Sequence, residues 1–280
     1  MYEIINNQLI NEEEKIMDIK EIKKYVKHTY NVNCLLDRFG ANTKLKKSSK
    51  GIYNVAGLSL MPSLKFCPNS TLAECFKECL KSAGRGVFNN VINARNNKSN
   101  FYNSDFELFK ILLRHELKLH VINCNKNEVN PSARLNVLSD NPYEKTGIFQ
   151  EFEEIYFYDY TKRANRIEAC NKIDNYKLMF SYSGATGYQK QVNQALMFNN
   201  PIAVVFKNTF PKFFLGRPVF DGDISDIDNS IKDNSIIGLK AKGSLARNSF
   251  NKFVVNIEDH LLHRYNDMQT SFTISFQPQF

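Results

Sequence analysis

The sequence predicts an α/β protein, and more narrowly a (β/α)8-like barrel of the TIM type, complete or irregular. Short apolar runs with strand character recur along the chain, and several are separated by stretches of helical length. Strands that alternate with helices are typical of parallel βαβ units. About eight such units in 280 residues suit one barrel. The expected strands are residues 55–60, 134–138, 154–160, 177–182, 202–207, 218–221, 236–241 and 252–256.

The chain is expected to form one main domain. No stretch rich in Pro, Gly or Ser divides it, and no internal repeat is visible. We predict a barrel domain over residues 51–256, a helical extension over 1–50 and a tail over 257–280 that packs on the barrel. Within the extension, apolar residues at helical intervals predict that residues 1–28 are helical.

Composition limits the class of protein. With 42% hydrophobic and 24% charged residues, the chain has the balance of an ordinary globular protein. No apolar run approaches the roughly 18 residues of a membrane span, so no membrane partner is expected. The polar N-terminus and six unevenly spaced cysteines favour a reducing, cytoplasmic setting. The net charge of +8 permits a nucleic acid or nucleotide as partner but does not require one.

Three of the six cysteines fall within one short segment: Cys67, Cys75 and Cys79. The segment follows the first expected strand and is predicted to become a helix at Thr71, which has Glu74 at capping-box spacing. Two cysteines four residues apart on a helix share one face. Three converging thiols are suited to a metal ion or an iron–sulfur cluster, although the spacing matches no standard zinc pattern. The alternative is that these cysteines fill core space.

Polar residues follow several of the expected strands, and the carboxyl ends of barrel strands are where such folds place their chemistry. Thr161, Lys162 and Arg163 are suited to hold a carboxylate or phosphate, and a salt-bridged strand end is the alternative. The candidate catalytic residues are therefore Asp140, Thr161, Lys162 and Arg163. The candidate cofactor-binding residues are Ser181, Ser183, Asp221, Asp223 and Lys240.

The acidic segment after residue 220 allows two interpretations. Its four aspartates offer the hard oxygen ligands that Mg²⁺ prefers, which would suit phosphoryl transfer. The same sequence is typical of a turn in which Asp side chains accept backbone N–H groups. The four residues are Asp221, Asp223, Asp226 and Asp228.

Several motifs recur in an order that resembles one family. These are GLSLMPS at 57–63, CP at 67–68, CLKSAGRG at 79–86, RLNVLSD at 134–140, FYDYTKR at 157–163, YKLMFSYS at 176–183, PIAVVFK at 201–207, VFDGDISD at 219–226 and IIGLKAKG at 236–243. Together they resemble the gene product 88 family of bacteriophages over about residues 51–256. The resemblance implies a phage-type protein in the cytoplasm of the host cell.

The ground plan is also similar to proteins of the radical S-adenosylmethionine type. In those proteins a three-cysteine set follows the first barrel strand, and a later strand ends in a Thr-Lys-Arg segment. The resemblance implies a 4Fe–4S cluster on Cys67, Cys75 and Cys79, with one iron open for S-adenosylmethionine. Thiolates are suitable ligands for iron, and barrel walls keep water away from a radical.

Three functions follow as hypotheses. The first is an iron–sulfur, radical-enzyme-like barrel that acts on a nucleic acid, nucleotide or peptide. The second is a non-catalytic nucleic-acid-binding phage protein whose cysteines hold structural zinc or no metal. The third is a Mg²⁺-dependent phosphoryl-transfer enzyme that uses the aspartates between residues 221 and 228.

Overall fold

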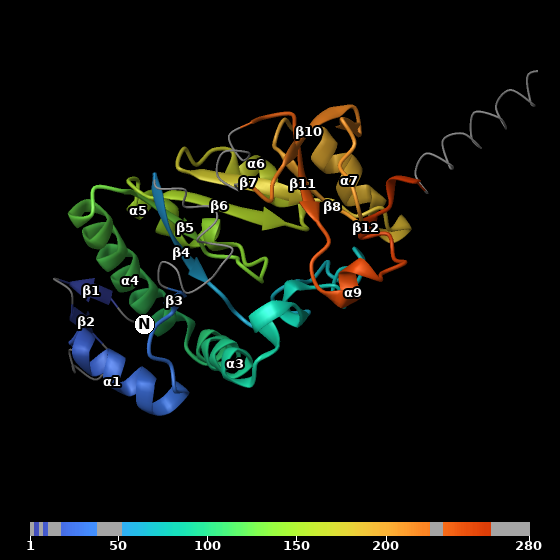
Figure 1. Ribbon diagram of the computed structural model, residues 1–280. Helices are drawn as coiled ribbons and strands as arrows, with labels where there is room; N and C mark the ends of the chain where they lie inside the picture. Colours follow the sequence, from blue (N-terminus) through green and yellow to red (C-terminus); the bar gives the residue numbers. More distant parts are fainter. Residues whose placement is uncertain (1–2, 6–7, 11–17, 38–51, 225–231, 259–280) are drawn as a thin grey trace, which may run out of the picture.

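The computed structural model describes residues 3–5, 8–10, 18–37, 52–224 and 232–258. A ten-stranded sheet runs through the molecule, and helices pack against it (Figure 1). A separate antiparallel hairpin joins β1 (Glu3–Ile5) to β2 (Gln8–Ile10). The prediction of an α/β protein is confirmed.

The strand order of the large sheet is β3-β4-β5-β6-β7-β8-β11-β10-β9, and β12 pairs with β8. Strands β4 to β8, β11 and β10 are parallel to one another, whereas β3 and β9 are antiparallel strands at the two ends. The strands are β3 (Leu36–Asp37), β4 (Tyr53–Leu58), β5 (Asn130–Arg134), β6 (Tyr156–Thr161), β7 (Tyr176–Ser181), β8 (Ile202–Phe206), β9 (Phe213–Phe214), β10 (Arg217–Asp221), β11 (Ile236–Lys240) and β12 (Val254–Val255).

The predicted (β/α)8-like barrel is wrong. Among the described residues β3 and β9 do not pair with each other, so the sheet is open. Strand β11 lies between β8 and β10, which interrupts the sequential order that a closed barrel needs. Strands β9 and β10 form a hairpin because Leu215 and Gly216 both adopt positive φ, 50° and 74°, which suits a tight hairpin turn. The hairpin places an antiparallel strand at the end of the sheet and stops the parallel series.

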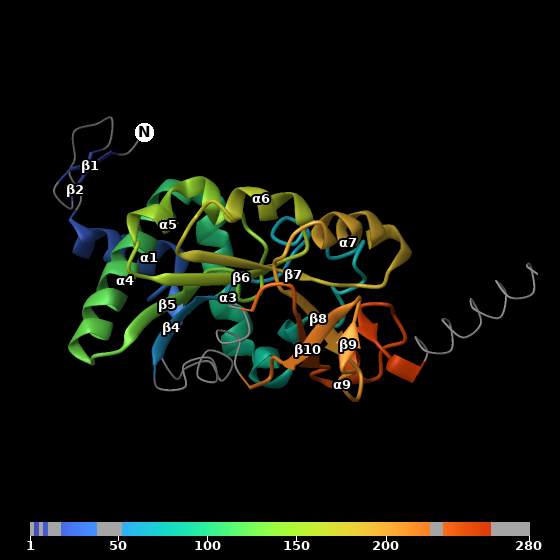
Figure 2. The same ribbon diagram turned by 90° about the horizontal axis from the view of Figure 1, so that it is seen from above.

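The helices that cross between the parallel strands cover one face of the sheet. Seen from above, α5, α6 and α7 lie along the same side (Figure 2). The register agrees, because β6 and β7 align Thr161 with Phe180 and Asp159 with Leu178, and these side chains belong to the helix-covered face. The helices are α1 (Ile19–Tyr30), α3 (Asn89–Ser104), α4 (Phe106–Lys126), α5 (Ile148–Glu151), α6 (Ile167–Cys170), α7 (Gln189–Leu196) and α9 (Ser244–Arg247). Short 3-10 turns are η1 (Leu80–Ser82), η2 (Gly84–Val87), η3 (Tyr143–Thr146), η4 (Ala164–Arg166) and η5 (Thr186–Tyr188).

Helix α4 shows why this face is buried. The side chain of Asp105 accepts the Leu108 backbone N–H at 2.9 Å and begins the helix. Leu113 and Leu117 lie one turn apart and are fully buried, because residues four apart share a helix face. Each buried leucine contributes about 2 kcal/mol by leaving water. The amphipathic helix therefore fixes one side of the sheet.

The opposite face of the sheet carries its own cluster of side chains. Tyr156, Tyr158 and Tyr160 alternate along β6 and lie on this face, as period-2 alternation predicts. The rings of Tyr156 and Tyr158 stack with centroids 6.4 Å apart. The Arg134 guanidinium lies 4.5 Å from the Tyr160 centroid. Aromatic and cationic packing thus occupies the face that a closed barrel would enclose.

The N-terminal extension is helical only in part. Residues 3–5 and 8–10 form strands, and the helix is α1, which ends where Asn31 takes a left-handed conformation. Ile22 and Val26 of α1 are buried in the same cluster as the sheet, so the helix contributes to the main core. The predicted tail lies outside the described residues beyond residue 258.

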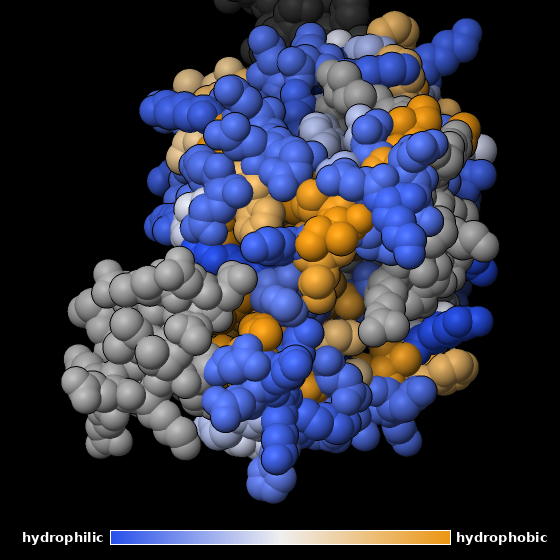
Figure 3. Space-filling model, turned by 90° about the vertical axis from the view of Figure 1, so that its left-hand side faces the viewer, coloured by the Kyte–Doolittle hydropathy of each residue, from blue (hydrophilic) through white to orange (hydrophobic). Residues whose placement is uncertain are grey.

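The surface gives no sign of one broad apolar area on the side shown in Figure 3. That side is mostly hydrophilic, and its hydrophobic residues form small groups between hydrophilic ones. No helix in the described ranges is both long and apolar enough to cross a membrane.

Candidate functional site

The carboxyl ends of β4, β5, β6 and β7 lie at one edge of the sheet because these neighbouring strands are parallel. The loops that follow them bring together residues that are far apart in the chain. Asp140 donates its backbone N–H to Phe66 O at 2.8 Å. The Asn69 amide donates to Lys162 O at 2.9 Å. The loop after β4, which carries the cysteines, is thereby joined to the loops after β5 and β6.

The cysteine loop is not the helix that the capping-box spacing predicts. Glu74 has a φ of 53°, a left-handed conformation that interrupts a right-handed helix. The Cys75 N–H bonds to Ser70 O at 3.0 Å, and the Cys67 N–H bonds to Ser63 O at 2.7 Å, so the segment is a series of turns. Cys79 precedes the 3-10 turn η1. The three cysteines therefore lie on a folded loop and not on one helix face.

The three thiols nevertheless influence one another electrostatically. Burial raises the pKa of Cys67 to about 12, and the nearby groups Asp140, Cys79 and Cys75 raise it further, whereas Arg163 lowers it. Burial also raises the pKa of Cys75, and Lys162 opposes that shift. Each thiol therefore lies within electrostatic reach of the other two.

The donor set fits a thiophilic metal in kind, because three thiols and no competing imidazole gather on one loop. The arrangement of the three thiols does not fit a metal ion. No group of three or more His, Cys, Asp or Glu side chains among the described residues is placed to hold a metal ion. Instead, the Cys67 thiol donates to Leu138 O and the Cys75 thiol donates to Ser70 O, each at 3.6 Å. Metal binding would have to replace both of these bonds.

Asp140 is the centre of a buried ion cluster beside this loop. Its carboxylate accepts the Thr161 hydroxyl at 2.8 Å and the Lys162 backbone N–H at 3.0 Å. It also forms a short ion pair with Arg166, and the Arg163 Nε lies 3.6 Å from Oδ2. Charge-assisted bonds of this kind are the stronger class of protein hydrogen bond. All four candidate catalytic residues thus meet in one cluster.

Lys162 connects the ends of β6 and β7. Its ammonium donates to Ser181 O and Tyr182 O, both at 3.0 Å, and lies 4.4 Å from the Phe253 ring centroid. Burial lowers the pKa of Lys162 to about 8, although Cys75 and other nearby acidic groups oppose the shift. The lysine therefore places a buried cation next to the cysteine loop.

The remaining candidate residues form separate local groups. The Ser183 hydroxyl is buried and accepts the Ala185 N–H at 3.2 Å. At the β10 end, the Asp221 carboxylate accepts the Asp223 N–H at 2.9 Å, and Asp223 accepts the Lys240 N–H at 3.0 Å. This is the backbone-capping pattern of a turn. Among the candidates outside the described residues are Asp226 and Asp228.

Sequence reasoning missed three charged residues of this region. Arg166 is buried and pairs with Glu144 at 2.7 Å, and the neighbouring tyrosine and carboxylates raise its pKa although burial lowers it. Asp159 lies fully buried on the helix-covered face, where it accepts Asn136 N–H at 2.7 Å. The available signal was the single acid in the strand sequence FYDY, since a charge among aromatic residues in a strand needs a buried partner.

These features define an α/β protein with an open, mainly parallel sheet and a polar, cysteine-bearing carboxyl edge. The model of one protein family, gene product 88, matches residues 34–256. The chain therefore belongs to the gene product 88 family of bacteriophage proteins. Comparison with curated proteins gave no match. No solved structure matched the chain either.

Proposed function

We propose that Cys67, Cys75 and Cys79 bind an iron–sulfur cluster in an enzyme that acts on a nucleic acid, nucleotide or peptide. One observation carries the proposal: the three thiols belong to the loop after the first parallel strand, β4, and each influences the protonation of another. Thiolates are the ligands that clusters require. The three thiols also lie at the sheet edge where open α/β folds bind ligands.

The surrounding charges favour this proposal. Three thiolates together would repel one another, and the raised pKa values of Cys67 and Cys75 keep these thiols protonated without metal. Cys67 and Cys75 would have to lose these protons in order to hold iron, since metal ligands must be deprotonated. Lys162 and Arg163 lie close enough to compensate part of the negative charge that results. When bound, a 4Fe–4S cluster with S-adenosylmethionine supplies radical chemistry.

The roles of the chain's own residues follow from their exposure. Lys162 is buried, and its ammonium donates to two carbonyl oxygens at the end of β7. It therefore joins the ends of β6 and β7 and keeps a positive charge at this edge of the sheet. The Arg163 side chain is 24% exposed and lies beside Cys67, which makes its guanidinium the group that reaches an anionic substrate. Asp140 holds Arg163 in place through its carboxylate and its backbone oxygen.

Anaerobic purification tests the proposal. We expect coloured protein that contains iron and acid-labile sulfide, and we expect Cys75→Ser to lose both while its circular dichroism is unchanged. Cys34→Ser is the matched control, because Cys34 lies outside the cysteine loop, and it keeps its iron. Protein without iron, or full iron content in Cys75→Ser, contradicts the proposal. Zinc in place of iron supports the hypothesis of a nucleic-acid-binding protein with a structural metal.

The net charge of +8 makes a polyanion the first substrate to examine. If single-stranded or duplex nucleic acid binds, its affinity falls linearly on a log–log plot against salt, because bound cations are released. Filter binding at several salt concentrations measures the slope. A flat response rules out a nucleic acid held by phosphate contacts and leaves a nucleotide or a peptide as the substrate.

A further inference from the structure

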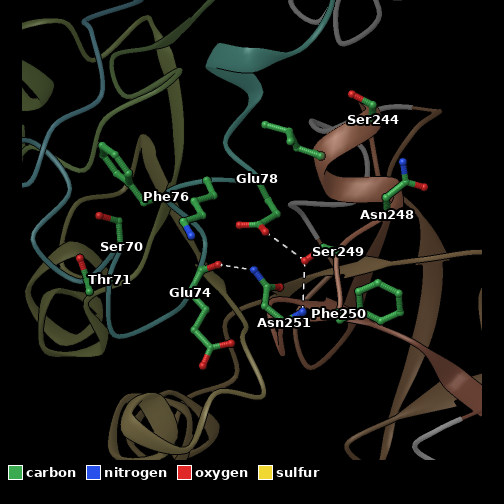
Figure 4. Close-up of a pocket in the computed structure, with 12 residues that line it drawn as sticks. Ser70, Thr71, Glu74, Phe76, Glu78, Ser244, Asn248, Ser249, Phe250 and Asn251 are labelled. Carbon is green, nitrogen blue, oxygen red and sulfur yellow. Dashed lines mark hydrogen bonds between the residues drawn. The ribbon is translucent and has the colours of Figure 1, made fainter.

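A pocket of about 680 Å³ lies between the cysteine loop and the segment formed by α9 and the residues that follow it. One wall is formed by residues 70–78 and the other by residues 244–251 (Figure 4). Its lining includes none of the three cysteines and none of the four candidate catalytic residues. The pocket is therefore distinct from the site proposed above.

Two glutamates join the walls of the pocket. Glu78 accepts the Ser249 hydroxyl at 3.0 Å through Oε1, as the dashed line in Figure 4 shows. Glu74 accepts the Asn251 amide at 2.7 Å through its backbone oxygen and the Lys252 N–H at 3.0 Å through Oε2. These bonds hold residues 249–252 against the cysteine loop, so the two walls of the pocket are fixed relative to each other.

One acceptor at this wall is unsatisfied. The second carboxylate oxygen of Glu78, Oε2, is buried and has no hydrogen-bond partner among the described residues. A buried oxygen of this kind costs free energy until a donor reaches it. The buried Ser70 hydroxyl, on the same wall, also has no partner within the described ranges. A ligand that donates hydrogen bonds would satisfy these two groups.

The rest of the lining adds negative charge and apolar surface. Glu74 and Glu78 outnumber the one cationic residue of the lining, Lys77. Phe250 is 93% exposed at the pocket, and its ring already lies 5.0 Å from one ammonium, that of Lys207. Exposed aromatic rings attract cations through their π face. Carboxylates and an exposed aromatic ring in one pocket lining match a cation attached to a flat or apolar group.

We propose that this pocket binds an organic cation, an amine, amidine or guanidinium on a flat or apolar group, with Glu78 as acceptor and Phe250 as the ring contact. Arginine and lysine side chains of a peptide belong to this class of ligand. The proposal does not depend on a metal at the cysteines. It assigns a binding role to Glu78, which the sequence patterns did not single out.

Benzamidine, a flat amidinium, is the probe, and the full chain is observed by ¹H–¹⁵N NMR during titration. We expect amide shifts within residues 70–78 and 244–251, and no shifts with benzoate, which has the opposite charge. Glu78→Gln should weaken benzamidine binding about tenfold, because a charge-assisted hydrogen bond is lost. Glu154→Gln, an exposed glutamate outside the pocket lining, is the control and binds like the wild type.

Equal shifts with benzoate, or unchanged affinity in Glu78→Gln, overturn the proposal. If Glu78→Gln fails to fold, Phe250→Ala replaces it, since a residue this exposed leaves the fold intact, and its affinity must fall several-fold. Cys75→Ser should keep benzamidine binding because the thiol does not line the pocket. Failure of iron loading and failure of cation binding are thus measured separately.

Discussion

The two acidic groups at strand ends differ in what surrounds them. The Asp140 side chain, in the loop after β5, is 5% exposed and contacts Thr161 and Arg166. The Asp223 side chain, after β10, is 17% exposed and pairs with Lys242, whose side chain is 44% exposed. Both follow strands of one sheet and both belong to motifs that predict a site. Asp140 is buried among its partners and belongs to a fixed cluster. Asp223 lies nearer to solvent and accepts a backbone N–H in a turn. Strand position alone therefore does not distinguish a structured site from a solvated one.

The largest expected effect comes from removing the buried acid. Asp140→Ala leaves Arg166 and Arg163 without their shared carboxylate, and breaking a buried ion cluster costs about 3–5 kcal/mol. Asp223→Ala should cost about 1 kcal/mol, because its pair with Lys242 is partly exposed to solvent. Urea unfolding of both variants measures the difference. Equal losses of stability would remove the distinction between the two regions.

A second prediction concerns pH and the buried acid of β6. Burial raises the pKa of Asp159 to about 7, although Arg134 and Asn136 lower it. The folded pKa lies above the unfolded value near 4, so the folded state binds the proton more tightly. The stabilisation is complete below about pH 4 and is lost between about pH 4 and pH 7, by about 4 kcal/mol, because each pKa unit corresponds to about 1.4 kcal/mol.

The variant Asp159→Asn isolates this effect, because asparagine is similar in shape and does not titrate. The difference in unfolding free energy between wild type and variant should decline from pH 4 to pH 7. A difference that is constant over that range, or that grows with pH, would show that Asp159 is already ionised in the folded protein below pH 4.

The smallest effect tests the backbone that ends the cysteine loop. A Cβ on Gly86 would lie 2.8 Å from Lys81 O and 3.0 Å from Leu80 O, so the backbone must move. Gly86→Ala should therefore cost about 1–2 kcal/mol. Gly187→Ala is the matched control, since its Cβ would meet only Leu72 Cδ2 at an ordinary 3.7 Å. A neutral Gly86→Ala in thermal unfolding would show that this loop adapts freely.

The sequence patterns predicted the strands better than their assembly. The apolar runs at β7, β8 and β11 lie within a residue or two of the prediction, because buried parallel strands are continuous and apolar. Strand β5 was placed four residues late, since its sequence NPSAR is polar and contains proline. The insertion of β11 between β8 and β10 has no local signal, so the open sheet was not predictable.

The sequence predicted which residues belong to the candidate site but not how they are arranged. Asp140 and the run from Thr161 to Arg163 follow parallel strands, and parallel strands bring their ends together, as the structure shows. The cysteine helix failed because Glu74 adopts a positive φ, which requires tertiary contacts that spacing does not reveal. Asp159 and Arg166 were missed because a buried ion pair depends on neighbours far along the chain.

Thiol alkylation mapped by mass spectrometry tests the central claim most directly. Protein reconstituted with iron and sulfide under anaerobic conditions should protect Cys67, Cys75 and Cys79 together from iodoacetamide, while Cys34 is labelled to the same extent as before. The account predicts joint protection, because one cluster occupies all three thiolates. Protection of one or two of them, or of none, would contradict a shared metal centre at the carboxyl edge.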